Sequence, residues 1–437
     1  MIGPGAGLSF ANGARALRHR NYRLFFGGQL ISLVGTWMQT VAQGWLILQL
    51  TGDAFLLGVV AALQWLPVMF LGLFGGIIAD ALPKRRTLIV TQAAKMTLSF
   101  TMFALVASGV VEVWQVAILA FLGGLTNVVD MPTRQAFAVE MVGREDIGNA
   151  VALNSAMFNS ARILGPAVAG LTIGAFDISI AFFVDAISFL AVLIALVAMR
   201  ESELRPAPPM ARPTSAGEVL TGLREGLSYV RRTPLVLLAV LVIGLVSTFG
   251  MNFPVVIPPF TEQVLHSDAT GYGFLMAASG LGSLVAALYI AFSPRSRTML
   301  IAGGAILVGV AEIALATAHL FSASLALMFL IGLGAIAMAA TANTTIQLAV
   351  PDRLRGRTMA VYTTVFAGST PIGGLLMGWI ASRFGVAESL AAGGIACAAI
   401  GVAAFAWLRR LRADALVEAK ARQATGAGTA PAAARPR

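Results

Sequence analysis

Twelve long apolar segments constrain the fold of this chain more than any other feature of its sequence. A helix that crosses the ~30 Å hydrocarbon core of a bilayer needs roughly 20 apolar residues, because it rises ~1.5 Å per residue. The segments are continuous, whereas the strands of a membrane barrel are shorter and alternate in polarity. We therefore expect twelve transmembrane helices. The expected spans are 24–50, 55–78, 87–108, 113–137, 148–174, 178–199, 235–261, 269–292, 298–318, 322–349, 358–382 and 388–408.

The composition agrees with a membrane protein. Hydrophobic residues make up 58% of the chain and charged residues only 11%, against about 45–50% and about 25% in soluble domains. This balance excludes an ordinary soluble enzyme, a disordered protein and a collagen-like fibre. Residues 1–22 lack the cleavage site of a signal peptide. The single Cys397 and three scattered histidines provide neither a disulfide framework nor a metal site, and no span contains a histidine.

Basic residues mark one side of the expected membrane topology. Of the 30 lysine and arginine residues, 27 fall in loops and termini that the twelve spans place on the same side. Because cytoplasmic loops are enriched in lysine and arginine, both termini are predicted to be cytoplasmic in a plasma (inner) membrane. The net charge of +10 then faces the cytoplasm and anionic lipid, and does not indicate nucleic acid as a partner.

A polar segment, residues 201–234, divides the chain into two halves. It ends in an amphipathic stretch from Glu218 to Arg232, and a shift of 215 residues aligns Gly35 with Gly250. Such a duplication is typical of transporters that bind their substrate between two halves. We therefore predict an all-α integral membrane protein with two pseudo-symmetric six-helix bundles. The predicted domains are a cytoplasmic segment 1–22, bundles 23–200 and 235–410, a cytoplasmic linker 201–234 and a disordered cytoplasmic tail 411–437.

The loop after the second span carries a first motif. Gly76, Asp80, Lys84 and Arg85 fall at positions that resemble the signature loop of the major facilitator superfamily, although Ala81 and Pro83 depart from it. Gly76 would allow close helix packing, and Asp80 would pair with a base, for which Arg134 is a candidate. The resemblance implies a gating loop; the alternative is an ordinary basic loop that sets topology.

A second motif lies in the fifth span. Arg162, Gly165, Pro166 and Gly170 resemble the Gly-Pro-x-x-Gly-Gly motif of drug–proton antiporters in the same superfamily, with Ala169 in place of one glycine. Residues 130–162 also resemble the branch that contains the enterobactin exporter and drug-efflux proteins. The resemblance implies export. The alternative is a glycine motif that only packs helices.

Five charged residues fall inside the expected spans and away from the span ends, where charge is costly and suggests function. They are Lys95, Asp130, Arg162, Asp185 and Glu312. Their depths predict two ion pairs, Lys95 with Asp130 and Arg162 with Asp185, either functional or static. Glu312 has no base at its depth, so we expect it to be neutral. Asp130, Asp185 and Glu312 are the candidates for proton coupling.

Polar side chains follow one face of the first span. Gln29, Ser32, Thr36, Gln39 and Gln43 are separated by steps of three and four residues, which is helical periodicity. Amides facing lipid are unfavourable, so this face is predicted to line a cavity, or alternatively to bond to neighbouring helices. Further cavity-lining candidates are Asn127, Asn159, Asn252, Asn343 and Gln347, and Pro254 and Pro258 suggest that the seventh span is broken.

Together these features predict a secondary transporter that exports a small amphipathic molecule, a drug or siderophore, as a monomeric proton antiporter. The expected energy source is the proton gradient, without a cofactor, because the sequence lacks a phosphate-binding Gly-x-x-x-x-Gly-Lys-[Ser/Thr] loop. An importer of the same family and a membrane sensor remain alternatives. A membrane enzyme is disfavoured, because no nucleophile–base or metal constellation is visible.

Overall fold

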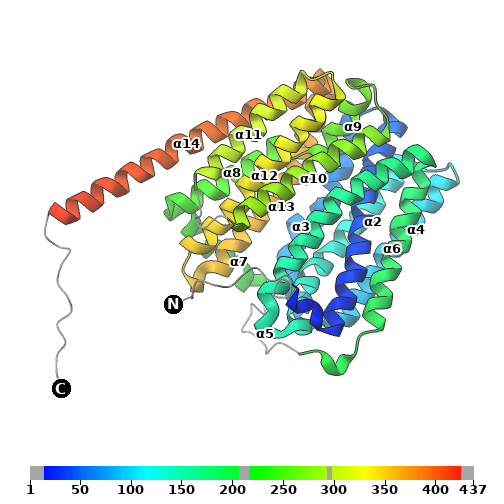
Figure 1. Ribbon diagram of the computed structural model, residues 1–437, viewed down its shortest axis with the longest axis horizontal. Helices are drawn as coiled ribbons and strands as arrows, with labels where there is room; N and C mark the ends of the chain where they lie inside the picture. The colour runs from blue at the N-terminus through cyan, green and yellow to red at the C-terminus, as the bar shows by residue number, and fades with distance from the viewer. Residues whose placement is uncertain (1–13, 206–215, 293–297, 425–437) are drawn as a thin grey trace.

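The computed structural model describes residues 14–205, 216–292 and 298–424, and in these ranges the protein is helical without a β-strand. Its elements are η1 (Arg15–Arg18), α2 (Arg20–Thr51), α3 (Ala54–Ala81), α4 (Lys84–Ala107), α5 (Val113–Ala175), α6 (Ile178–Val197), η2 (Glu201–Glu203), α7 (Ala216–Arg232), α8 (Pro234–Gly250), α9 (Phe253–Gln263), α10 (Ala269–Phe292), α11 (Met299–Ala316), α12 (Phe321–Ala349), α13 (Asp352–Phe384) and α14 (Val386–Ala424). Figure 1 shows these helices side by side in one elongated bundle.

Each of the twelve expected spans overlaps a helix. The fourth and fifth both lie in α5, which is interrupted at Gly143 (φ 74°, ψ 178°), a conformation that glycine adopts readily. The seventh comprises α8 and α9, separated by Met251 and Asn252.

Within the described residues, ten helical segments are long and apolar enough to cross a membrane. The expected spans 24–50 and 148–174 are helical but do not meet this criterion, because each carries several polar side chains.

The helices pack in two groups that meet along two lines. In the first group α2 packs on α5 and α6, and in the second α11 packs on α12 and α14. The groups meet where α3 contacts α13 and where α5 contacts α10. A Cβ atom on Gly58 would overlap the Gly374 carbonyl, and one on Gly273 would overlap the Pro166 carbonyl. Glycine is therefore required at these points for the backbones of the two halves to touch.

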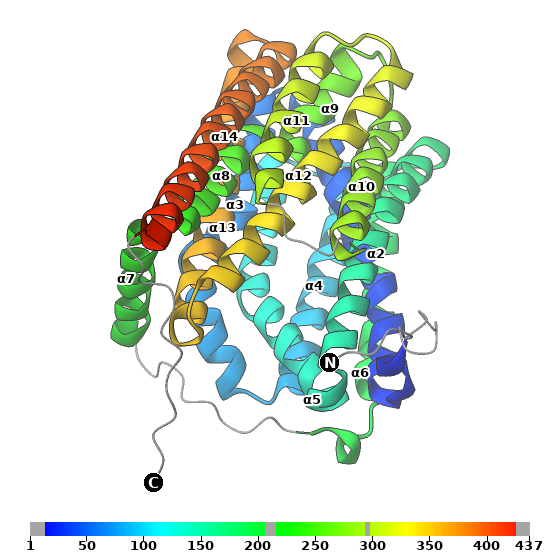
Figure 2. The same cartoon turned by 60° about the vertical axis from the view of Figure 1, so that its left-hand side comes forward.

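The two ends of the bundle are packed differently. We call the end where α2 begins and α14 ends the terminal face, and the opposite end the distal face. One hydrophobic core spans both halves at the distal face and includes Trp45, Phe182, Phe260 and Tyr272. Toward the terminal face, each half instead has a core of its own. In Figure 2 the distal face is at the top, around α9. The halves therefore share buried apolar surface at one end only.

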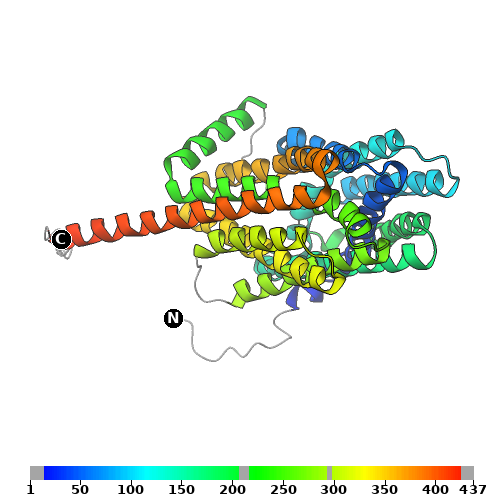
Figure 3. The ribbon, with the colours of Figure 1, turned by 90° about the horizontal axis from the view of Figure 1, so that it is seen from above.

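The segment between the halves and the end of the chain form two peripheral helices. The expected amphipathic stretch is α7, which packs on α8 and α13, and Figure 3 shows it at the edge of the bundle. We expected disorder from residue 411, but α14 continues as a helix to Ala424, because alanine, glutamate, lysine and arginine favour helix. Residues 425–437, 206–215 and 1–13 lie outside the described ranges.

The α3–α5 contact corrects one sequence-based interpretation. We expected Gly76 to allow close packing, but a Cβ atom on Gly76 would have no neighbour within 4 Å. On the preceding residue, Gly75, a Cβ atom would overlap the carbonyl oxygen of Val128 on α5. One residue changes the direction by about 100° around a helix, so the two adjacent glycines face different surroundings.

These neighbours give a matched pair of variants for a stability test. Gly75→Ala should lower the apparent melting temperature of the detergent-solubilised protein by several degrees, because overpacking costs about 1–3 kcal/mol. Gly76→Ala should leave it unchanged or raise it, because alanine favours helix by about 1 kcal/mol. Thermal unfolding followed by size-exclusion chromatography measures both, and equal melting temperatures for the two variants would contradict the α3–α5 contact.

Candidate transport site

The bases of the loop after α3 are held within the first half. Lys84 Nζ lies 2.8 Å from Glu140 on α5, and Arg85 donates to the carbonyl oxygens of Leu196 and Val197 at the end of α6 and to Glu201. The side chain of Asp80 lies outside the described part of the structure. Sequence reasoning missed Glu140 as the partner of Lys84, although it is an acid in the next basic loop.

Arg134 contacts an acid that the sequence analysis had not assigned to it. Its guanidinium lies 3.7 Å from Asp130, one helical turn away on α5. The spacing of four residues within one helix brings Asp130 within reach, whereas the predicted partner Asp80 has its side chain outside the described part of the structure. Arg134 thus adds a second positive charge to the buried Asp130.

Asp130 is the centre of a polar network between α4 and α5, in which both of its carboxylate oxygens have partners. One carboxylate oxygen accepts from Thr91 (2.8 Å) and Gln92 (2.7 Å), and the other lies 2.9 Å from Lys95 Nζ. The Lys95–Asp130 contact predicted from equal depth is therefore present. Asp130 is fully buried, and a buried ion pair persists only when its remaining valences are satisfied. This arrangement stabilises the ionised form of Asp130, because both of its carboxylate oxygens already have partners among the described residues.

Asp185 occupies a different environment on α6, and the predicted pair with Arg162 is wrong. Its Oδ2 accepts from Ser99 (2.6 Å) on α4, while its Oδ1 is buried without a hydrogen-bond partner. Arg162 instead lies over the Trp37 ring, 5.9 Å from its centroid. Both residues lie beside the same segment of α2, but α2 separates α5 from α6 there. Gly165 of α5 abuts Trp37 of α2, and Gly35 of α2 abuts Asp185 of α6.

Neighbouring residues of α4 contact the two aspartates. Lys95 and Ser99 are one turn apart on α4, so they share a helix face. The Lys95 ammonium lies 2.9 Å from Asp130, and Ser99 donates to Asp185. The half-buried Lys95 therefore lies beside one acid that is fully bonded, and one turn from the hydroxyl that bonds the other acid.

The glycines of the fifth-span motif connect helices from both halves. A Cβ atom on Gly165 would overlap the Trp37 side chain of α2. On Gly170 it would lie 3.0 Å from the Ala269 carbonyl oxygen, at the start of α10. Pro166 lies between them inside α5. The motif therefore positions α5 against the other half, as its small residues suggested.

The polar face of the first span is partly buried. Gln29, Ser32 and Gln43 are buried, Gln39 is half-buried and Thr36 is exposed. Gln29 Oε1 has no hydrogen-bond partner, and Thr36 donates to the Ser32 carbonyl. The described structure therefore buries most of this face and leaves Thr36 exposed.

The remaining cavity-lining candidates lie on α5, at the break of the seventh span and on α12. Asn127 and Asn159 are half-buried on α5, and Asn159 donates to the Ser155 carbonyl. Asn252 is buried at the break of the seventh span. On α12, the exposed Gln347 donates to the half-buried Asn343 (2.5 Å). These residues occupy both halves, and none of their hydrogen bonds among the described residues crosses between the halves.

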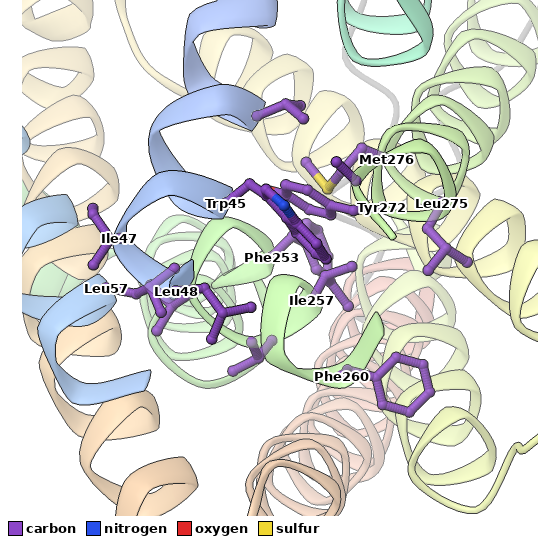
Figure 4. Close-up of a cluster of buried hydrophobic side chains, with 14 of the residues drawn as sticks. Trp45, Ile47, Leu48, Leu57, Phe253, Ile257, Phe260, Tyr272, Leu275 and Met276 are labelled. Carbon is purple, nitrogen blue, oxygen red and sulfur yellow. The ribbon is translucent and has the colours of Figure 1, made fainter. Parts of the chain in front are cut away.

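Aromatic side chains close the distal end of the interface. The rings of Trp45 on α2 and Tyr272 on α10 stack with centroids 6.2 Å apart and an interplanar angle of 21°. Phe253 and Ile257 of α9 lie directly beside them (Figure 4). Aromatic stacking and burial both favour this contact, so the distal face is sealed by residues from both halves.

Comparison with known proteins agrees with this architecture. The family described as transmembrane secretion effector matches residues 11–426. The multidrug efflux pump Tap of Mycolicibacterium fortuitum is 30% identical over 393 residues, which cover 86% of this chain and 93% of Tap. The staphyloferrin A transporter of Staphylococcus aureus is 23% identical over 89% of this chain and 97% of its own length.

Solved structures share the fold at low identity. A nucleoside transporter NupG mutant superposes with a TM-score of 0.69 at 12% identity, covering 90% of this chain and 99% of that one. A bacterial homologue of the lysosomal transporter Spinster, inward-facing and unoccupied, gives 0.68 at 13% identity over 91% and 96%. The expected family is confirmed, and the matched proteins are membrane transporters rather than enzymes. With its two helical halves and a family match over nearly its whole length, the chain belongs to the major facilitator superfamily of membrane transporters, in the family of transmembrane secretion effectors.

Proposed function

We propose that this protein exports a small amphipathic molecule from the cytoplasm by alternating access, with protons entering in exchange. In this mechanism the two halves rock about the α3–α13 and α5–α10 contacts. The terminal face is cytoplasmic, as the distribution of lysine and arginine indicates.

The single observation that carries the proposal is the distribution of the hydrophobic cores. Both halves contribute to the core at the distal face, and each has a separate core toward the terminal face. The described ion pairs at the terminal face, such as Lys84–Glu140 and Arg357–Glu225, each join residues of one half. This arrangement favours a state that is closed to the outside and open to the cytoplasm, one of the two states that alternating access requires.

The relatives favour export and an amphipathic cargo. They are named a multidrug efflux pump, a staphyloferrin A transporter and, in Streptococcus pyogenes, macrolide efflux protein A. A substrate that enters from the terminal side would meet the polar face of α2, with Thr36 and Gln39, and the aromatic Trp37 and Phe158. Polar groups for orientation among aromatic surfaces suit a cargo with both characters.

Asp185 is the best candidate for proton coupling in the first half. Asp130 is fully bonded, whereas Asp185 has a buried oxygen without a partner and accepts from Ser99, one turn from Lys95 on α4. Protonation of Asp185 removes one negative charge beside Ser99, which is one turn along α4 from the Lys95–Asp130 pair. Such a change alters the electrostatic balance between α4 and α6 and thereby links proton uptake to helix movement.

Sided labelling tests the orientation and the open face. In a Cys397→Ala background, which removes the single cysteine, Thr36→Cys should react with a membrane-impermeant maleimide in inverted vesicles and not in right-side-out cells. The control is Ile31→Cys, which is 54% exposed on another side of α2; we expect that side to face lipid, so it should react in neither. Labelling of Thr36→Cys only from outside the cell would contradict the orientation.

Asp185→Asn tests the coupling. In proteoliposomes with a panel of fluorescent amphipathic dyes, transport driven by a pH gradient should fall about tenfold or more, because an acid that senses the gradient is lost. Dye exchange without a gradient should continue, since the isosteric amide preserves the packing. Glu388→Gln, at an exposed acid on α14, is the matched control and should retain gradient-driven transport. Full gradient-driven transport by Asp185→Asn would overturn the role of this residue.

A further inference from the structure

The seventh span is interrupted at a point that its own sequence dictates. α8 ends at Gly250 and α9 begins at Phe253, and Met251 and Asn252 have non-helical backbone angles. In a continuous helix the Gly250 carbonyl would accept from residue 254, but Pro254 has no N–H. Asn252 supplies one replacement, because its Nδ2 donates to the Thr248 carbonyl (2.7 Å). The end of α8 therefore presents backbone carbonyl groups inside the protein.

A buried acid from another helix lies against this break. Glu312 on α11 is 3% exposed, and a Cβ atom on Gly250 would lie 3.2 Å from each of its carboxyl oxygens. Oε2 of Glu312 has no hydrogen-bond partner. Glu312, Gly250 and Asn252 line one small cavity, which has room for about one water-sized group.

The surroundings of Glu312 provide no compensating charge. From α14, Cys397 approaches the same point on Gly250 (2.6 Å from that Cβ position) and is the titratable group that faces Glu312. From α8, α9 and α13 the neighbours are Phe249, Val256 and Met377. Among the described residues no lysine, arginine or histidine forms an ion pair with Glu312. An ionised carboxylate buried in this way requires a cation, and a neutral one requires a proton.

The end of α8 attracts the same kind of ligand. The C-terminus of a helix carries partial negative charge on its free carbonyl groups and favours cations. Broken membrane helices use such carbonyl groups to hold coupling ions. Carboxyl oxygens, backbone carbonyl groups and a cavity for one small group therefore meet at one place.

We propose that Glu312 and the α8–α9 break form a binding site for a single monovalent cation, either a proton or a sodium ion. With the cation bound, Glu312 is neutralised and the end of α8 is held against α11. Release leaves an uncompensated carboxylate beside the helix end, which favours movement of α8 and α9. Since α9 also contributes to the distal seal through Phe253 and Ile257, the site connects cation binding to the closure of the distal face. Its role in transport rests on the proposed function, whereas the binding itself does not.

Thermal unfolding of the purified full chain distinguishes the two cations. Melting temperatures are measured for the wild type, Glu312→Gln and the control Glu262→Gln, an exposed acid on α9. Each is measured in NaCl and in choline chloride at equal ionic strength, at acidic and alkaline pH. A ligand that binds only the folded state raises its stability by mass action. Infrared difference spectra between wild type and Glu312→Gln report whether the carboxyl group is protonated.

Sodium binding and proton binding predict different melting temperatures and spectra. Sodium binding predicts that NaCl raises the melting temperature of wild type and Glu262→Gln by several degrees, but not that of Glu312→Gln. Proton binding predicts no sodium effect, a protonated-carboxyl band that is missing in Glu312→Gln, and a loss of wild-type stability at alkaline pH that Glu312→Gln does not show. Identical responses of wild type and Glu312→Gln to both ions overturn the site. If Glu312→Gln does not fold, a wild-type melting temperature insensitive to both sodium and pH overturns it.

The test is independent of the proposed export. If Asp185→Asn loses gradient-driven transport while Glu312→Gln behaves as the wild type, the cation site is wrong and the proposed function stands. If Glu312→Gln changes ion binding while neither variant affects transport, the site exists and the proposed coupling fails.

Discussion

A carboxyl group inside a bilayer must be neutral or matched by a partner, and this constraint separates the three buried acids of the protein. Asp130 is matched by Lys95 and Arg134 and by two neutral donors, so it is held as an ion. Asp185 has one donor, and Glu312 has an oxygen without any. Because an unmatched charge in such a place is expensive, the two incompletely bonded acids are the ones whose charge is able to change during a transport cycle.

The same constraint explains how the halves join. A bilayer offers little hydrophobic driving force between helices, so association depends on close backbone contact. Gly58 with Gly374, and Gly170 with Gly273, provide that contact on two sides of the interface. Aromatic packing around Trp45 and Tyr272 then closes the distal end. Tight glycine contacts and an aromatic seal at one end suit two rigid bodies that pivot against each other.

The sequence predicted the fold well and the site in part. Apolar length and loop charge were sufficient for the helical architecture, because the bilayer imposes both. Equal depth correctly paired Lys95 with Asp130, which lie on adjacent helices. It failed for Arg162 and Asp185, because depth contains no information about direction around the helix axis. The sequence also did not show that Gly75, and not Gly76, is the glycine that packs against α5. The helical tail to Ala424 was missed because its alanine-rich composition also occurs in disordered segments.

Alternating access is the central claim, and paired distances across the two faces test it most directly. In a Cys397→Ala background, spin labels are placed at the exposed distal residues Phe176 and Leu320, and in a second protein at the exposed Val151 and Leu348 toward the terminal face. Double electron–electron resonance is recorded in acidic and alkaline buffers. Rocking predicts that any condition that lengthens the distal distance shortens the terminal one. Distances that lengthen together, or that do not change under any condition, would contradict the account.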